Sequence, residues 1–170
     1  FAARGAGGVK LIRVDIFSIQ GKYGLVMLHH SLEHMERQRE IFEKIAKLLK
    51  DKNSVCMVCV PVCTGYAFEK YRENWVQLDA PRHLFLHSPK SIRYLAAHAG
   101  MRVVKVIYDS NSFQFIGSEM YQKNIAGTER RKLKNCLLYA GKSVLKYSKM
   151  AEIMNEEKRG DQAVFILKLR

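Results

Sequence analysis

The sequence predicts an α/β fold built on a mostly parallel sheet, and three observations point to it. Two short apolar runs, Leu25–Leu28 and Val55–Val60, contain no polar alternation, which is typical of strands that are covered on both faces. Residues 36–50, which lie between them, have the apolar spacing of one helix face. Strand, helix and strand in this order predict a βαβ unit with a right-handed crossover.

The first residues of the chain read as a lead-in to this unit. Residues 1–8 contain three glycines within four positions and are expected to be flexible. They do not predict a phosphate-binding loop, because no strand precedes them and no helix follows. Val9–Val14 is a short run of strand-forming residues, and Gly21–Gly24 turns the chain into the first doubly covered strand.

The later elements are marked by clear start and stop signals. The helix over 36–50 has acidic residues early and lysines late, as the helix dipole favours. Ser88 and Pro89 are a cap and a first helical residue, and that second helix ends at Gly100. Apolar runs at Met101–Ile107 and Ala163–Leu169 predict two further strands.

Two stretches do not follow these periodic patterns. Residues 63–87 are irregular and rich in aromatic, His and Arg residues, which favours an active-site loop. Residues 112–150 read as a helical insertion, with one helix ending near Lys123 and a basic amphipathic helix over Thr128–Lys149. A basic helix face can lie on phosphates or acidic substrates, but it is more often a solvated outer face.

Composition bounds the class of protein. At 170 residues the chain fits one domain, and its longest uncharged apolar run is far short of a membrane-spanning helix. A net charge of +13 favours anionic partners, either nucleic acid, phosphorylated metabolites or membrane surfaces, without choosing among them. Cys56 and Cys59 point to opposite faces of a strand, so we expect them to be reduced, without a shared metal or bridge, in a cytoplasmic protein.

Polar residues collect directly after the first doubly covered strand. The run Leu25–Leu28 is followed by His29, His30, Ser31, Leu32, Glu33 and His34. Ligands of open α/β sheets bind beyond the carboxyl ends of the strands, so this cluster is a candidate for chemistry. The alternative is a buried strand followed by an ordinary solvated loop.

With these residues in view, the chain resembles the class I S-adenosylmethionine-dependent methyltransferases of small-molecule type. The resemblance rests on Leu32-Glu33-His34, Leu48-Leu49-Lys50 and Val60-Pro61, in that order. It continues through Asp79-Ala80-Pro81-Arg82-His83-Leu84-Phe85, Ser88-Pro89 and Ala99-Gly100-Met101. The match covers roughly residues 9–107.

The resemblance implies a Rossmann-like sheet whose C-terminal strand is antiparallel to its neighbours. The family's first strand and glycine-rich loop have no counterpart here, and neither does the acidic residue that ends its second strand. Gly24 stands where the family commonly has Asp. The chain is therefore expected to be an N-terminally truncated domain that binds S-adenosylmethionine weakly or not at all. Either residues 9–14 or a second chain would then cover the edge of the 25–29 strand, the latter as a homodimer.

The resemblance also implies roles for particular residues. The cofactor would contact Asp15, Ile16, Leu28, His29 and His30. His30 and His83 are the candidate bases for removing a proton from the acceptor. The acceptor pocket would be shaped by Trp75, Arg82 and His87, although His83 and His87 could instead pack against or cap the next helix. Arg82 could bind an anionic acceptor or pair with Asp79.

A metal site and two other functions remain open from the sequence. Some methyltransferases hold a divalent cation with a Glu-x-x-Glu-His pattern and a distant His, and Glu33, His34 and His83 would match part of it. His30 replaces the first Glu, so no metal is expected. The chain could also be a non-catalytic relic of the fold, or a basic protein that binds nucleic acid or a membrane surface through the helix at 128–149.

Overall fold

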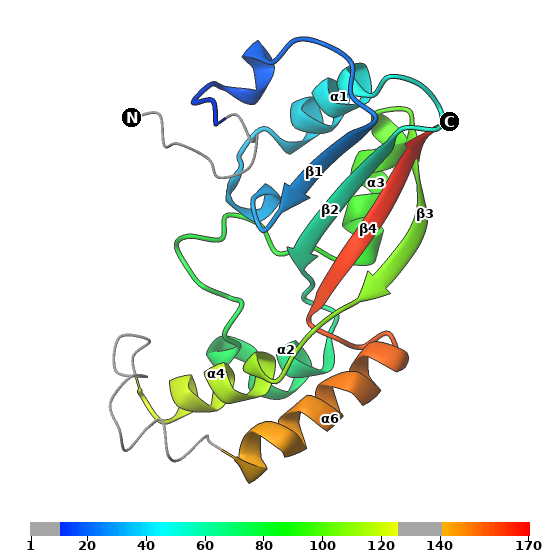
Figure 1. Ribbon diagram of the computed structural model, residues 1–170. Coiled ribbons are helices and arrows are strands. Elements are labelled where there is room, and N and C mark those ends of the chain that lie inside the picture. The colour runs from blue at the N-terminus through cyan, green and yellow to red at the C-terminus, as the bar shows by residue number, and fades with distance from the viewer. Residues whose placement is uncertain (1–10, 126–140) are drawn as a thin grey trace.

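The computed structural model describes residues 11–125 and 141–170, and a four-stranded sheet lies at its centre (Figure 1). The strands are β1 (Leu25–His29), β2 (Val55–Pro61), β3 (Met101–Tyr108) and β4 (Gln162–Leu169), in the order β1-β2-β4-β3. β1 and β2 are parallel, and β4 is antiparallel to both β2 and β3. The four predicted strands and the antiparallel direction of the last are confirmed. β4 lies inside the sheet, with β1 and β3 at the two edges.

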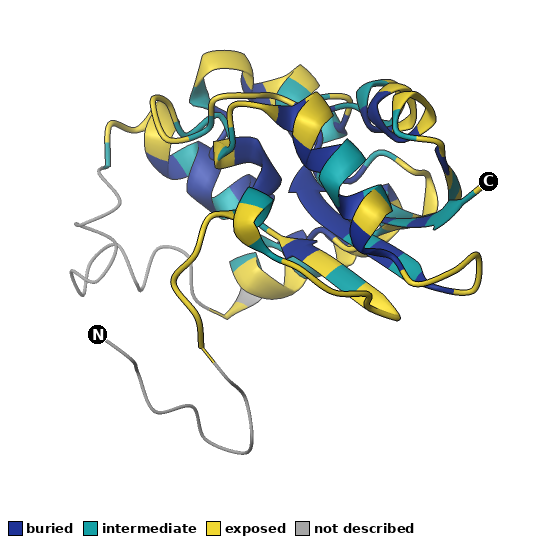
Figure 2. Ribbon diagram, turned by 90° about the horizontal axis from the view of Figure 1, so that it is seen from above, coloured by how far each residue is buried: buried dark blue, intermediate teal, exposed yellow. Residues whose placement is uncertain are grey.

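Two helices cover one face of this sheet. They are α1 (Gln38–Leu48) and α3 (Pro89–His98), both of which were predicted. α3 begins at a capping box, in which the Ser88 hydroxyl accepts from the Ser91 amide and the Ser91 hydroxyl accepts from the Ser88 amide. Fully buried Phe42 and Ile45 of α1 meet Ile92 of α3 and the inward residues of the strands. Figure 2 shows buried positions, in dark blue, along the strands and along parts of the helices beside them.

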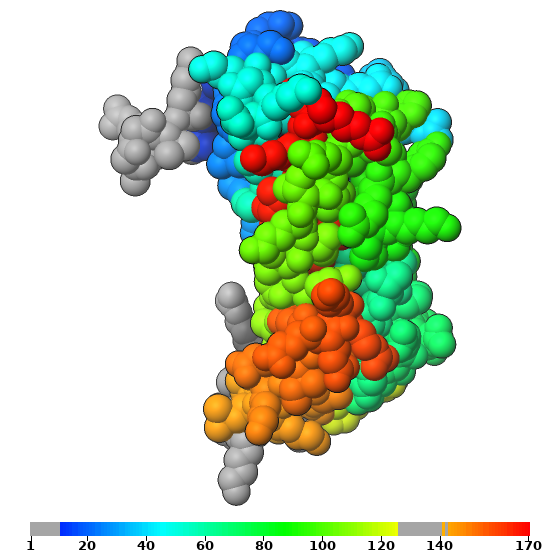
Figure 3. Space-filling model, turned by 90° about the vertical axis from the view of Figure 1, so that its right-hand side faces the viewer, coloured from blue at the N-terminus to red at the C-terminus, as the bar shows by residue number. Residues whose placement is uncertain are grey.

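Three further helices form a layer beyond the carboxyl ends of β1, β2 and β3. They are α2 (Tyr66–Tyr71), α4 (Phe113–Gln122) and α6 (Lys142–Glu156). They enclose a second core cluster that contains Tyr71, Trp75, Phe115 and Tyr147. Figure 1 shows this layer below the sheet, and Figure 3 shows α6 lying directly below β3. None of the helices in the described ranges combines the length and the apolar content that crossing a membrane requires.

The other face of the sheet carries no helix in the described ranges, as Figure 1 shows. Along β1 the burial alternates: Val26 and Leu28 pack toward α1 and α3, whereas Leu25, Met27 and His29 are exposed. Within the described residues β1 pairs only with β2, so its second edge is also open.

The expectation of a strand over Val9–Val14 is wrong for residues 11–14, which are irregular. This apolar segment pairs with no strand of the described chain, so its backbone has no neighbouring strand for hydrogen bonds. Three of its side chains are more than half exposed: Leu11, Ile12 and Val14. These residues do not dock beside β1. The lead-in at 1–8 and residues 9–10 lie outside the described residues.

Two other stretches also differ from expectation. Residues 63–87 are not irregular throughout, because α2 and the 3₁₀ turn Arg72–Asn74 lie within them. Buried Ala67 and Tyr71 hold α2 against the second core cluster. Of the basic helix expected over 128–149, residues 128–140 lie outside the described residues. α6 continues past Lys149 to Glu156, since Ala151 and Met154 pack in the same cluster.

Candidate active site

The site begins at His30, the residue that follows β1. Its backbone is left-handed, with a φ of 45°, which is uncommon for a residue other than glycine. The His30 amide donates a 3.0 Å hydrogen bond to the carbonyl of Cys59, the last residue of β2 to pair with β1. This bond holds the strained residue at the carboxyl edge of the sheet, where ligands of α/β proteins bind.

Glu33 lies under this histidine, in the 3₁₀ turn Leu32–His34. Only 1% of its side chain is exposed, and neither carboxylate oxygen has a hydrogen-bond partner in the described part of the chain. His30 lies beside it, with Nδ1 3.4 Å from Glu33 Oε1. A buried carboxylate without hydrogen bonds is costly, so a neighbouring positive charge stabilises it.

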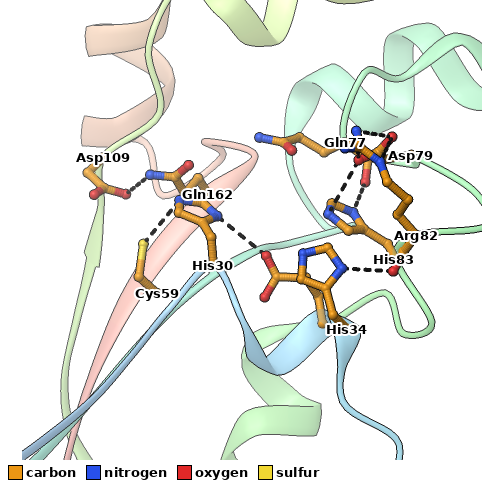
Figure 4. A network of polar contacts seen from close by, with 10 residues as sticks. His30, His34, Cys59, Gln77, Asp79, Arg82, His83, Asp109 and Gln162 are labelled. Carbon is orange, nitrogen blue, oxygen red and sulfur yellow. Dashed lines mark hydrogen bonds and ion pairs between the residues drawn. The ribbon is translucent and has the colours of Figure 1, made fainter. Parts of the chain in front are cut away.

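His34 and His83 complete the cluster, although they are far apart in the sequence. The carbonyl of Glu33 accepts hydrogen bonds from the amides of Leu84 and Phe85, and this brings the 82–85 segment to the turn. The rings of His34 and His83 lie 4.8 Å apart. The structure thus brings both candidate bases, His30 and His83, to one cluster around Glu33 (Figure 4).

Backbone carbonyls fix the orientation of these two rings. Nδ1 of His34 lies 2.8 Å from the carbonyl of Arg82, and Nδ1 of His83 lies 2.7 Å from the carbonyl of Gln77. A carbonyl only accepts, so each Nδ1 carries the proton. Nε2 of His83 lies 3.8 Å from the carboxylate of Asp79. Both nitrogens of His83 therefore face groups other than Glu33.

The side chain of Arg82 pairs with Asp79, which was one of the two alternatives predicted for it. Arg82 Nη2 lies 2.5 Å from Asp79 Oδ2, and this carboxylate raises the pKa of the guanidinium above its ordinary value. The Arg82 side chain remains 75% exposed. It can therefore swing to a ligand only by leaving Asp79.

The structure does not bring Trp75 and His87 to this cluster. Trp75 is fully buried and His87 is 2% exposed, so neither presents a surface to an acceptor in this arrangement. Trp75 belongs to the second core cluster. The ring of His87 lies between Gln38 of α1 and Ser91 of α3, and burial lowers its pKa to about 4. This is the packing role that the sequence left open for His87.

Cys59 is a member of the site that sequence reasoning missed, because it looked like an inert core residue. Its Sγ lies 3.6 Å from Nε2 of His30. Burial, followed by the charges of Asp109 and Glu33, raises the pKa of its thiol to about 12. One signal could have found it: aligning the first residues of the two apolar runs, Leu25 with Val55, places Cys59 opposite His29, as the strand register does.

The expected cofactor residues fall into two separate places. Asp15 and Ile16 line a cleft of about 340 Å³ in front of α1, together with residues such as Met35 and Arg37. The Asp15 carboxylate caps the 3₁₀ turn Ile16–Ser18 by accepting from the Phe17 amide at 2.8 Å. Leu28 is buried in the main core. His29 and His30 lie at the carboxyl edge and are not part of the cleft's lining.

Within residues 11–125 and 141–170, two groups of side chains have the composition of a metal site. One contains Glu33, His34 and His83, the set that the sequence suggested as an alternative, and the other contains His29, His30 and Cys59. In each group the candidate ligand atoms all lie within 4.8 Å of one another. The two groups are neighbours, because Glu33 of the first contacts His30 of the second.

Comparison with solved structures shows the fold. A methyltransferase from Archaeoglobus fulgidus, described as S-adenosylmethionine-dependent, is 16% identical with a TM-score of 0.55, over 96% of this chain and 69% of that one. Magnesium protoporphyrin IX methyltransferase from Synechocystis, solved with bound S-adenosylhomocysteine, is 10% identical with a TM-score of 0.51, over 92% of this chain and 49% of that one. This chain thus spans between half and about two thirds of their lengths.

Comparison with sequences gives the family. No curated protein matches the chain. The profile of the methyltransferase domain family matches residues 5–106, which is more than half of the sequence and includes β1, α1, β2, α3 and most of β3. On that match, and on the shared fold, the chain belongs to the methyltransferase domain family.

Proposed function

We propose that this chain acts in S-adenosylmethionine-dependent methyl transfer to a small-molecule acceptor. The family membership supports the reaction class. The observation that carries the proposal is the pair formed by His30 and the buried carboxylate of Glu33 at the carboxyl edge of the sheet. Methyl transfer needs acceptor and donor held in line, and a hydroxyl or amine acceptor must also lose a proton.

The cleft lined by Asp15 and Ile16 suits the adenine part of S-adenosylmethionine. The cleft beside Asp15 and Ile16 joins a carboxylate acceptor to apolar side chains, and this combination suits the flat, amine-bearing adenine ring. Asp15 would accept from the adenine amine and Ile16 would cover the ring. When bound, the cofactor supplies an electrophilic methyl group on a sulfonium.

His30 has the contacts of a general base. The Glu33 carboxylate, 3.4 Å from Nδ1, favours the proton on that nitrogen and so leaves the lone pair on Nε2. The near neighbour of Nε2 is the Cys59 thiol, a weak hydrogen-bond donor. An acceptor hydroxyl can replace that weak contact and pass its proton to Nε2. The charge of Glu33 then stabilises the imidazolium, much as a buried carboxylate does in hydrolase triads.

His83 and Arg82 are suited to orienting the acceptor. The His83 side chain is only 7% exposed and its Nδ1 is held by the Gln77 carbonyl, which favours a positioning role over proton transfer. Arg82 is exposed at the same loop, so an anionic group on the acceptor could exchange with Asp79 as its partner. We therefore expect acceptors with a carboxylate or phosphate to be preferred.

The test is product formation by the purified chain. S-adenosylmethionine is supplied with panels of neutral and anionic hydroxyl, amine and thiol compounds, and S-adenosylhomocysteine is measured by mass spectrometry. His30→Gln should lower product formation by about 10²–10⁴-fold, the usual contribution of a general base. His98→Gln is the matched control, since His98, the last residue of α3, forms an exposed pair with Glu43 of α1 at 3.3 Å.

A result that contradicts the proposal is equally clear. If no acceptor gives S-adenosylhomocysteine above the level of His30→Gln, the chain does not carry this activity. If the two histidine variants lose activity alike, His30 is not the base.

The cysteines support a cytoplasmic location. Cys56, Cys59 and Cys63 are all free thiols, and the first two are buried. Disulfides are rare in reducing compartments, and buried thiols without partners are the usual state there.

A further inference from the structure

We propose that Cys59, His30 and His29 form a binding site for a zinc-type divalent cation at the carboxyl edge of the sheet. The ligand atoms of these three side chains all lie within 4.8 Å of one another. One thiol and two imidazoles are ligands that zinc prefers, and three protein ligands leave a fourth position open, as in catalytic zinc sites.

The strand register explains why these side chains share one face. His29 and Cys59 are register partners in the parallel pair β1–β2, so they project from the sheet on the same side. In a regular strand His30 would project from the opposite side. Its left-handed backbone breaks that alternation and turns its ring back toward Cys59.

The distance between the two inner ligands fits a tetrahedral ion. Nε2 of His30 and Sγ of Cys59 are 3.6 Å apart. Zinc–nitrogen and zinc–sulfur bonds of usual length, at a tetrahedral angle, place the two ligand atoms roughly 3.5 Å apart. The pair is therefore already spaced for an ion, and the ligand atom of exposed His29 lies within 4.8 Å of both.

Glu33 supplies the outer contact that such a site requires. Zinc-bound histidines usually donate their second N–H to a carboxylate, which fixes the tautomer and strengthens the ligand. Nδ1 of His30 lies 3.4 Å from Glu33 Oε1, on the side of the ring away from Cys59. A cation here would also offset the buried charge of Glu33, which has no hydrogen-bond partner in the described part of the chain.

The neighbouring group of Glu33, His34 and His83 is less well arranged. Nδ1 of His83 is bound to the Gln77 carbonyl at 2.7 Å, and its Nε2 faces the carboxylate of Asp79 at 3.8 Å. Figure 4 shows the His83 ring turned toward Gln77 and Asp79, and the His30 ring beside Cys59. The other ring nitrogen of His30, Nδ1, lies near Glu33.

The cation site would also select the acceptor of the methyl transfer proposed above, and this role rests on that proposal. A hydroxyl or thiol at the open position loses its proton to water more readily, because a bound cation stabilises the anion. The acceptor lone pair then forms the bond to the methyl carbon, and the carbon–sulfur bond breaks with its electrons left on the sulfur. In this form of the reaction His30 holds the ion and does not take the proton.

Cobalt(II) titration of the metal-free full chain tests the site without any turnover. We expect one ion per chain, tetrahedral visible bands and a near-ultraviolet sulfur-to-cobalt charge-transfer band that zinc abolishes. Cys59→Ser should remove the charge-transfer band. Cys63→Ser, which changes a half-buried thiol just beyond β2, is the matched control and should retain it.

Two further variants keep the test decisive if Cys59→Ser folds poorly. His29→Gln changes an exposed residue and should weaken cobalt binding, and Glu33→Gln should weaken it about 10–100-fold while keeping the sulfur band. Absence of the band at saturating cobalt, or its survival in Cys59→Ser, overturns the proposal. So does a spectrum without sulfur character that His34→Gln abolishes, because it places the ion in the neighbouring group.

The outcome is separable from that of the methyl-transfer proposal. Cobalt binding with no methyl transfer leaves the metal site standing and removes the reaction. Methyl transfer that survives both chelation and Cys59→Ser retains the reaction with His30 as base and removes the role of the ion.

Discussion

Nε1 of Trp75 donates a 3.0 Å hydrogen bond to Oδ2 of Asp161, and this bond joins the helical layer to the start of β4. Both residues are buried, Trp75 fully and Asp161 to within 2%. The Asp161 carbonyl also accepts from the Val62 amide at the end of β2. A residue predicted to shape an acceptor pocket therefore fastens the second core cluster to the sheet.

Asp161→Asn should stabilise the protein at neutral pH. Burial raises the pKa of Asp161 to about 6, above the ordinary value of 3.8, so the folded state binds this proton more tightly than the unfolded state. The associated stability is complete below pH 4 and is lost as the pH rises through 6. Asparagine keeps an oxygen for Trp75 and carries no charge.

Urea denaturation at two pH values measures this effect. At pH 7.5 the variant should be more stable than the wild type by about 1–3 kcal/mol, and below pH 4 the difference should disappear. A variant that is less stable at pH 7.5 would show that the carboxylate is charged and well compensated in the fold.

His87 should make the protein sensitive to acid. Burial lowers its pKa from 6.5 to about 4, and the neutral ring accepts from Gln38 Nε2 at 3.2 Å. Because the folded pKa is depressed, the contribution to stability is present above pH 6.5 and is lost as the pH falls to 4. His87→Gln should be less stable at pH 7 but lose about 3 kcal/mol less than the wild type between pH 6.5 and 4. Urea denaturation across this range checks it, and exposed His98→Gln should behave as the wild type.

Much of the fold was predictable because local signals and burial agree. The unbroken apolar runs of β1 and β2 predict buried strands, and Ser88-Pro89 predicts the start of a helix. Residues 11–14 have the same strand-forming composition but no partner strand, so strand propensity alone gave a wrong prediction there. The position of β4 between β2 and β3 depends on long-range pairing, which periodicity does not record.

The candidate site was partly predictable for a related reason. His30 and His34 follow a strand end, where polar clusters collect, and the turn of the 82–85 segment brings His83 to them. Trp75 and His87 have the composition of pocket residues, but their burial depends on partners in distant elements, Asp161 and Gln38. Cys59 escaped notice because its contact with His30 depends on the left-handed turn at that residue, although the strand register alone places it opposite His29.

The open edge of β1 should pair with a second copy of the chain. Leu25 and Met27 are at least half exposed on a strand that has only one neighbour in the described ranges. Unpaired apolar edges associate readily, and a charge on them prevents it. Light scattering should give twice the chain mass of 19.6 kDa, and Met27→Lys should give the monomer. Val104→Lys, on the opposite edge strand β3, should leave the dimer intact; a monomeric wild type would refute the prediction.

This chain by itself should bind S-adenosylmethionine no more tightly than it binds adenosine. The cleft beside Asp15 and Ile16 suits the adenine ring, whereas no glycine loop leading into a helix is found in the described residues to cradle the methionine end. Binding energy should therefore come from the adenine end, and calorimetry should give both ligands similar dissociation constants, weaker than micromolar.

Asp15→Asn tests which contact supplies that energy. It keeps an oxygen for the Phe17 amide but loses the charge that would face the adenine amine, so both ligands should weaken together. Asp51→Asn is the matched control, because Asp51 also caps a turn, by accepting from the amides of Asn53 and Ser54 away from the cleft. If S-adenosylmethionine binds ten times more tightly than adenosine, or at micromolar affinity, the chain holds the methionine end through residues outside this cleft, and the prediction fails.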